Sequence, residues 1–132
     1  MAADRRTVTA SDAPEAIGPY SHAVVTGGLL FCSGQVPLDP ATGKLVEGGA
    51  GAQAARCLDN LAAVCAAAGA ELADAVRVTV YLVDLPGDWP EVNEAYAAVF
   101  GSDPPARAAV GVAALPAGAR VEMDAVVALS ET

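Results

Sequence analysis

The sequence is poor in aromatic and basic side chains. Only 5% of its 132 residues are aromatic, and Lys and Arg together number 7 against 16 Asp and Glu, giving a formal net charge of −9. Because general binding to nucleic acids depends on clustered Lys and Arg against phosphates, this balance argues against a nucleic-acid partner. A small anionic ligand would still need a local positive group, so the few arginines become informative.

Patterns typical of metal sites and membrane spans are also missing. The single histidine, His22, cannot build a His-rich site, and Cys32, Cys57 and Cys65 lack the spacing of metal ligands. No uncharged apolar run approaches about 18 residues, and the N-terminus lacks the apolar stretch of a secretory signal. An odd number of cysteines fits a reducing compartment. We therefore expect a cytoplasmic protein with no metal and no membrane partner.

No repeat, linker or low-complexity tract divides the chain, so residues 1–132 are expected to form one domain. Apolar and polar residues alternate with the period of a strand from Val76 to Val83, whereas helical spacing runs from Gly51 to Ala68. Asp88 and Glu91 resemble a capping box that starts a second helix. The expected order is β-β-β-α-β-α-β-β, with strands at 7–9, 21–25, 29–33, 76–83, 107–113 and 120–129.

Two helices can cover only one face of such a mixed sheet. The other face would leave small and apolar side chains exposed, and self-association is the natural way to bury them. The sequence therefore predicts an α+β fold that associates through its bare sheet face.

An arginine and a carboxylate lie on the last two expected strands, joined by the short connection 115–118. If these strands pair, Arg107 and Glu122 would share a face. A guanidinium binds a carboxylate through two parallel hydrogen bonds, and a glutamate can hold or deprotonate a water. From the pattern alone, a structural salt bridge between the two is the stronger interpretation. Arg120 is expected to be an outward surface charge, and His22 to lie at the surface or an interface.

Four segments carry motifs that occur together in a known family. They are IGPYSHAV (17–24), FCSGQVPLDPATGKL (31–45), VNEAYAAVF (92–100) and PPARAAVGVAALPAGARVEMDAVV (104–127). Together they span nearly the whole chain in the family's order. On these motifs the sequence closely resembles the RidA/YjgF family of reactive intermediate (enamine/imine) deaminases.

The resemblance implies a chorismate-mutase-like protomer that assembles as a homotrimer with clefts between subunits. It also implies hydrolysis of reactive 2-imino and enamine acids to 2-keto acids and ammonia, without a cofactor. In the deaminase branch, the arginine matching Arg107 binds the substrate carboxylate and the glutamate matching Glu122 positions the attacking water. The equivalents of Tyr20, Ser33 and Asn93 line or support the cleft.

The sequence departs from the family's pattern at one place. Many family members have Arg-Ser-Cys where this chain has Arg107-Ala108-Ala109, so a cleft thiol is replaced by a methyl group. Hydrolysis needs no covalent nucleophile, and the change therefore bears on the shape of the pocket more than on the reaction.

A non-catalytic module that binds 2-keto acids remains an alternative. An endoribonuclease is a weaker one, because the chain is acidic and Lys44 is its single lysine.

Overall fold

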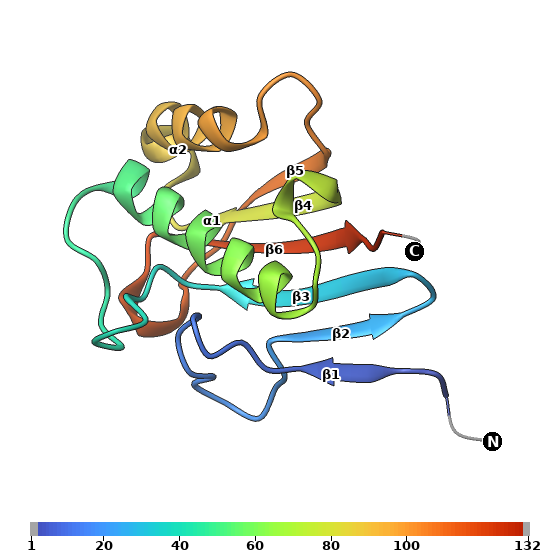
Figure 1. The fold of residues 1–132 in the computed structure, drawn as a ribbon. Helices are drawn as coiled ribbons and strands as arrows, with labels where there is room; N and C mark the ends of the chain where they lie inside the picture. The colour runs from blue at the N-terminus through green and yellow to red at the C-terminus, as the bar shows by residue number, and fades with distance from the viewer. Residues whose placement is uncertain (1–2, 131–132) are drawn as a thin grey trace.

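The computed structural model describes residues 3–130, which form a six-stranded mixed sheet with two long helices on one side (Figure 1). The elements are β1 (Arg6–Val8), β2 (Ala23–Thr26), β3 (Leu29–Gln35), α1 (Ala50–Ala67), β4 (Ala75–Leu82), α2 (Leu85–Phe100), β5 (Ala106–Gly111) and β6 (Val121–Ala128), with short 3-10 turns η1 (Leu72–Asp74) and η2 (Pro116–Gly118). The expected order of strands and helices is confirmed, with boundaries shifted by a few residues.

The strands are arranged in the order β1-β2-β3-β6-β4-β5. A tight turn joins β2 to β3, where Gly27 and Gly28 both adopt positive φ angles, as a two-residue hairpin turn requires. The β4–β5 pair is parallel, and helix α2 supplies the crossover that a parallel pair needs. Strand β6 is last in sequence but enters the sheet between β3 and β4.

The expected pairing of the last two strands is wrong. Strand β4 separates β5 from β6, and segment 112–120 carries the chain around the end of β4. Burial explains this order. In β6 every second residue is buried, which suits a central strand, whereas β5 consists of small, largely exposed residues that suit an edge.

Helix α1 packs against β3 and β6, and α2 lies beside α1 near the β4–β5 edge (Figure 1). The apolar face expected for α1 is confirmed, since Cys57, Leu61 and Val64 are fully buried. The opposite face of the sheet is bare, with Phe31 43% and Val110 41% exposed. No helix within the described residues is long and apolar enough to cross a membrane.

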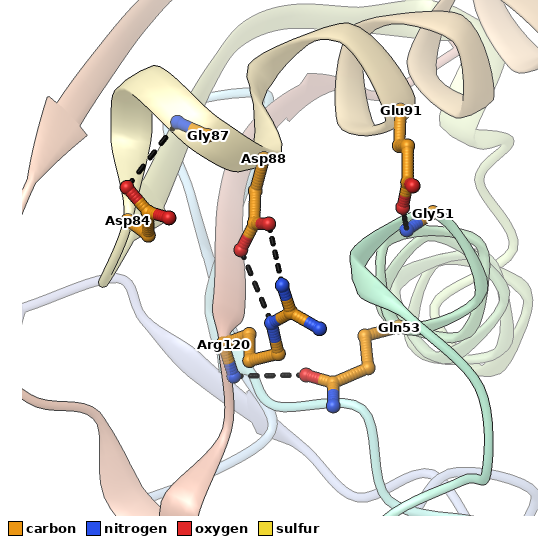
Figure 2. Close-up of polar contacts among 7 residues, drawn as sticks. All are labelled: Gly51, Gln53, Asp84, Gly87, Asp88, Glu91 and Arg120. Atoms are coloured by element: carbon orange, nitrogen blue, oxygen red, sulfur yellow. Dashed lines mark hydrogen bonds and ion pairs between the residues drawn. The ribbon is translucent and has the colours of Figure 1, made fainter.

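Helix α2 begins one turn earlier than the sequence pattern suggested. The Asp84 side chain caps it by accepting a hydrogen bond from the Gly87 N–H at 3.2 Å, and Pro86 fits the first turn, where its missing N–H is not needed (Figure 2). The expected capping box at Asp88 is therefore wrong. Asp88 lies inside the helix, 5% exposed, and faces Arg120.

Candidate active site

Arg107 projects from the edge strand β5 toward helix α2. Its register neighbour on β4 is Val78, which is fully buried beneath the helices, so Arg107 lies on the helical side of the sheet. Its guanidinium carbon lies 4.7 Å from the ring centroids of both Trp89 and Tyr96, and Nη1 donates to Oδ1 of Asn93 at 2.9 Å. The three partners form one stripe along α2. These contacts hold the guanidinium plane in place by cation–π stacking and one hydrogen bond.

The remaining guanidinium N–H groups are available to a ligand. No acidic side chain within residues 3–130 forms an ion pair with Arg107, which is exposed. The side chain lines a hollow of about 360 Å³ whose walls mix polar and apolar groups, formed by Asn93, Tyr96, Ala97, Phe100, Gly101, Pro104, Pro105 and Arg107. A fixed guanidinium without an acidic partner in such a hollow suits a small carboxylate. We call Trp89, Asn93, Tyr96 and Arg107 the arginine cluster.

A second group of predicted residues lies at the end of β3 and the start of β6. Tyr20, Ser33 and Glu122 line a hollow of about 230 Å³, together with Ile17, Gly34, Val36 and Pro116. Ser33 Oγ donates to the carbonyl oxygen of Ser21 at 2.6 Å, and the Tyr20 hydroxyl accepts the Ile17 N–H at 3.2 Å. We call this hollow the glutamate pocket.

Glu122 is the ionisable group that lines the glutamate pocket beside the Tyr20 phenol. Partial burial raises the pKa of the Glu122 carboxyl above its usual range, and the negative charge of Asp124 raises it further. A carboxylate with a raised pKa accepts a proton more readily near neutral pH. Glu122 is therefore suited to hold and deprotonate a water.

The five residues proposed from the sequence fall into two groups on opposite faces of the sheet. Arg107 and Asn93 lie on the helical side at the β5 edge, whereas Tyr20, Ser33 and Glu122 belong to the glutamate pocket. The expectation that Arg107 and Glu122 share a face is wrong within one chain, and they form no salt bridge. Strand β4 lies between them, and their side chains point to opposite sides. One chain thus does not bring the two groups together.

His22 is buried within the chain, contrary to the expectation of a position at the surface or an interface. It is 6% exposed, Nδ1 accepts the Ala10 N–H at 2.9 Å, and Nε2 donates to the Pro14 carbonyl oxygen at 2.8 Å. The ring therefore fixes segment 10–14, which leads into the part of the chain that carries Tyr20. This is a structural role.

Arg120 is exposed, as expected, but it is paired with a buried acid rather than being a free surface charge. Its guanidinium binds both carboxylate oxygens of Asp88, with Nε to Oδ2 at 3.1 Å, and its backbone N–H donates to Gln53 Oε1 at 2.8 Å (Figure 2). Glu91 also reaches from α2 to the N–H of Gly51 at 3.2 Å. These bonds join α1, α2 and the start of β6, the strand that carries Glu122.

Sequence reasoning missed the aromatic partners of Arg107. The available signal was the spacing of Trp89, Asn93 and Tyr96 along one helical stripe, but it pointed equally to a simple core face. Within residues 3–130, no group of three or more His, Cys, Asp and Glu side chains is clustered in a way that could hold a metal ion.

Comparison with known proteins matches almost the whole chain. A family model described as Endoribonuclease L-PSP matches residues 10–129. The chain is 49% identical over 123 residues to RutC family protein y4sK of Sinorhizobium fredii, covering 93% of this chain and 97% of that protein. It is 45% identical over 122 residues to the human 2-iminobutanoate/2-iminopropanoate deaminase, covering 92% and 88%. The crystal structure of RidA from the Antarctic bacterium Psychrobacter sp. PAMC 21119 superimposes with a TM-score of 0.89 at 43% identity, covering 94% and 99%.

Proposed function

Because the chain belongs to the RidA/YjgF family, we propose that it hydrolyses 2-imino acids, of the 2-iminopropanoate and 2-iminobutanoate type, to 2-keto acids and ammonia. The observation that carries the proposal is Arg107. Its guanidinium is fixed between two aromatic rings, lines a hollow and is paired with no acid in the described part of the chain. An arginine with only a structural role would be expected to face a carboxylate of its own protein, as Arg120 does.

The complete site is proposed to form between copies of the chain. The arginine cluster and the glutamate pocket lie on opposite faces of one protomer, and the bare sheet face exposes Phe31 and Val110. A homotrimer that buries this face would place Arg107 of one copy beside Glu122 of the next in a cleft between subunits. Tyr20, Ser33 and Asn93 then line or support that cleft.

The reaction follows from these positions. The substrate carboxylate binds the free edge of Arg107, which orients the imine carbon toward a water held by Glu122. The water oxygen bonds to that carbon, a water proton passes to Glu122, and the electron pair of the C=N π bond moves to nitrogen. Glu122 returns its proton to the nitrogen of this carbinolamine. The C–N bond then breaks as the C=O bond forms, and nitrogen leaves as ammonium with the hydroxyl proton.

This chemistry needs neither a metal nor an organic cofactor, because the protonated imine already accepts the electron pair. It also needs no covalent nucleophile, so Ala109 in place of a cysteine changes the shape of the cleft and leaves the steps intact.

The test is release of ammonia and 2-keto acid from imines generated in the assay by an amino-acid oxidase. Arg107→Ala is expected to lower kcat/KM at least about a hundredfold, and Arg107→Lys to recover only part of it, since an ammonium cannot form the planar fork. Arg5→Ala and Arg5→Lys serve as matched controls, because Arg5 is exposed and lines neither hollow. Wild-type turnover in Arg107→Ala would refute the assigned role.

Two other outcomes would select other functions. Saturable binding of 2-keto acids without imine turnover would indicate a ligand-binding module that uses the same cleft. The name of the matched family model makes endoribonuclease activity the other alternative. Salt-sensitive RNA binding would support it, although a net charge of −9 disfavours contact with phosphates.

A further inference from the structure

Glu122 has a second carboxylate beside it that the proposed reaction does not use. Asp124 follows it by two residues on β6, so both side chains point to the bare face of the sheet. Both are half-buried. The negative charge of Asp124 disfavours ionisation of Glu122, and unfavourable charge arrangements of this kind occur often at functional sites.

Tyr81 holds Asp124 in this position. Tyr81 is the cross-strand partner of Glu122 on β4, and its hydroxyl reaches diagonally to donate to Oδ2 of Asp124 at 2.8 Å. The hydrogen bond to Asp124 is the main reason that the pKa of Tyr81 lies above its usual value. The tyrosine therefore fixes the Asp124 side chain on the face that Glu122 occupies, and remains a neutral donor itself.

The other groups around Glu122 do not offset this negative charge. Toward β3 the neighbours are Ser33 and Gly34, and Tyr20 lines the pocket with its hydroxyl bound to a backbone N–H. On the helical side, burial raises the pKa of Cys57, which stays a neutral thiol and donates to the Val121 carbonyl oxygen at 3.6 Å.

The nearby arginines do not pair with Glu122. Arg120 is bound to Asp88. Arg77 is on the same face of the sheet as Glu122 but lies exposed opposite Val126, four residues further along β6. No Lys or Arg within residues 3–130 forms an ion pair with Glu122. Asp124 is thus the charged group that acts on Glu122.

We propose that Asp124, fixed by the Tyr81 hydroxyl, is a positioning residue that strengthens Glu122 as the acceptor of the water proton. Asp124 touches no reacting atom in this scheme. Its negative charge raises the affinity of Glu122 for a proton, and so brings the base closer to the operating pH. The inference rests on the proposed function for its catalytic meaning, whereas the coupling between the two carboxylates can be measured without it.

The experiment compares Asp124→Asn with Tyr81→Phe in the full-length protein. Asn keeps the shape and can still accept the Tyr81 hydrogen bond, so it removes only the charge. Phe keeps the charge and the ring but removes the tether. Glu71→Gln is the matched control, because it removes one exposed negative charge just before η1, from a residue that does not line the glutamate pocket. Circular dichroism and size-exclusion chromatography establish that each variant folds and assembles.

Two readouts are recorded for each protein. The first is the pH profile of kcat/KM for imine hydrolysis. The second is the titration of the Glu122 side-chain carboxyl by 13C NMR, with its signal assigned by its loss in Glu122→Gln.

In Asp124→Asn, the midpoint of the NMR titration and the acidic limb of the activity profile are both expected to move to lower pH. The plateau of kcat should fall roughly two- to fivefold, because a weaker base removes the water proton less readily. Tyr81→Phe should move the NMR midpoint and the acidic limb in the same direction but by a smaller amount. Glu71→Gln should leave both the midpoint and the limb where they are in the wild type. This combination separates Asp124 from a residue that only supports the fold, whose loss would lower activity without moving either midpoint.

An unchanged NMR midpoint in Asp124→Asn overturns the inference, whatever the activity. If the midpoint moves but the acidic limb of an active enzyme does not, the role of Asp124 in catalysis is overturned and the proposed deaminase function stands. If the wild-type protein hydrolyses no imine, the proposed function fails, and with it the catalytic role of Asp124.

Discussion

The carboxylate of Glu122 lies directly against Gly34 on the neighbouring strand β3. A Cβ atom at residue 34 would sit 3.0 Å from Cδ of Glu122 and closer still to Oε2. The absence of a side chain at position 34 is therefore what lets the carboxylate occupy the pocket that Tyr20 and Ser33 also line.

Gly34→Ala is expected to displace the Glu122 carboxylate and lower kcat for imine hydrolysis by roughly tenfold or more, because the water would lose its orientation. Gly111→Ala on β5 is the control, since its Cβ would meet Leu85 at an ordinary 3.6 Å. Steady-state assays of both variants check this. Equal turnover in the two would show that Glu122 need not occupy its observed place.

Complementation between two inactive variants tests whether the site lies between copies. Arg107→Ala retains the glutamate pocket, and Glu122→Gln retains the arginine cluster. Random mixing in a cyclic homo-oligomer gives an intact cleft at roughly one interface in four, so co-expression should restore about a quarter of wild-type activity. Each variant expressed alone is the control. Mixed oligomers as inactive as the parents would place the site within one chain, or exclude one of the two residues.

The Asp88–Arg120 pair is expected to contribute to stability. Arg120→Ala would leave the carboxylate of Asp88, which is 5% exposed, without its partner. Because the Arg120 side chain is 48% exposed, we expect the free energy of unfolding to fall by about 2 kcal/mol, below the range for fully buried pairs. Adding Asp88→Asn to Arg120→Ala should restore part of the lost free energy of unfolding.

Urea unfolding at one protein concentration measures these losses. The exposed Arg56–Asp59 pair, at 4.0 Å, provides the comparison, and Asp59→Ala should cost less than about 0.5 kcal/mol. A loss from Arg120→Ala no larger than that from Asp59→Ala would contradict the assigned role of Arg120.

The raised pKa of Glu122 predicts how stability depends on pH. The folded protein binds this proton more tightly than the unfolded chain, so ionisation of Glu122 costs stability above its ordinary value of 4.5 and nothing well below it. Glu122→Gln should therefore raise Tm by roughly 1–3 °C at neutral pH, a small gain because the side chain is only partly buried. The gain should vanish at pH values below 4.5.

Calorimetric scans of wild type and Glu122→Gln across this range measure the difference, with the exposed Glu71→Gln as control. A Tm difference that is the same at all pH values would mean that ionisation of Glu122 is not its cause. A lower Tm in Glu122→Gln at neutral pH would mean that the carboxylate stabilises the fold.

Local pattern in the sequence determined the elements and the direction of many side chains. The alternating pattern of β6 puts Val121, Met123 and Ala125 on the face opposite Glu122, and all three are buried. The helical spacing of Cys57 and Leu61 predicted the buried face of α1. Periodicity succeeds here because it depends on the geometry of a single element.

Only the tertiary structure decided which elements are neighbours. No local pattern says that β4 lies between β5 and β6, and this order alone puts Arg107 and Glu122 on opposite faces. The partners of His22 and Arg120 are likewise distant in the sequence. Strand order depends on loop closure and on which strands can be buried, and these are properties of the whole chain rather than of any segment.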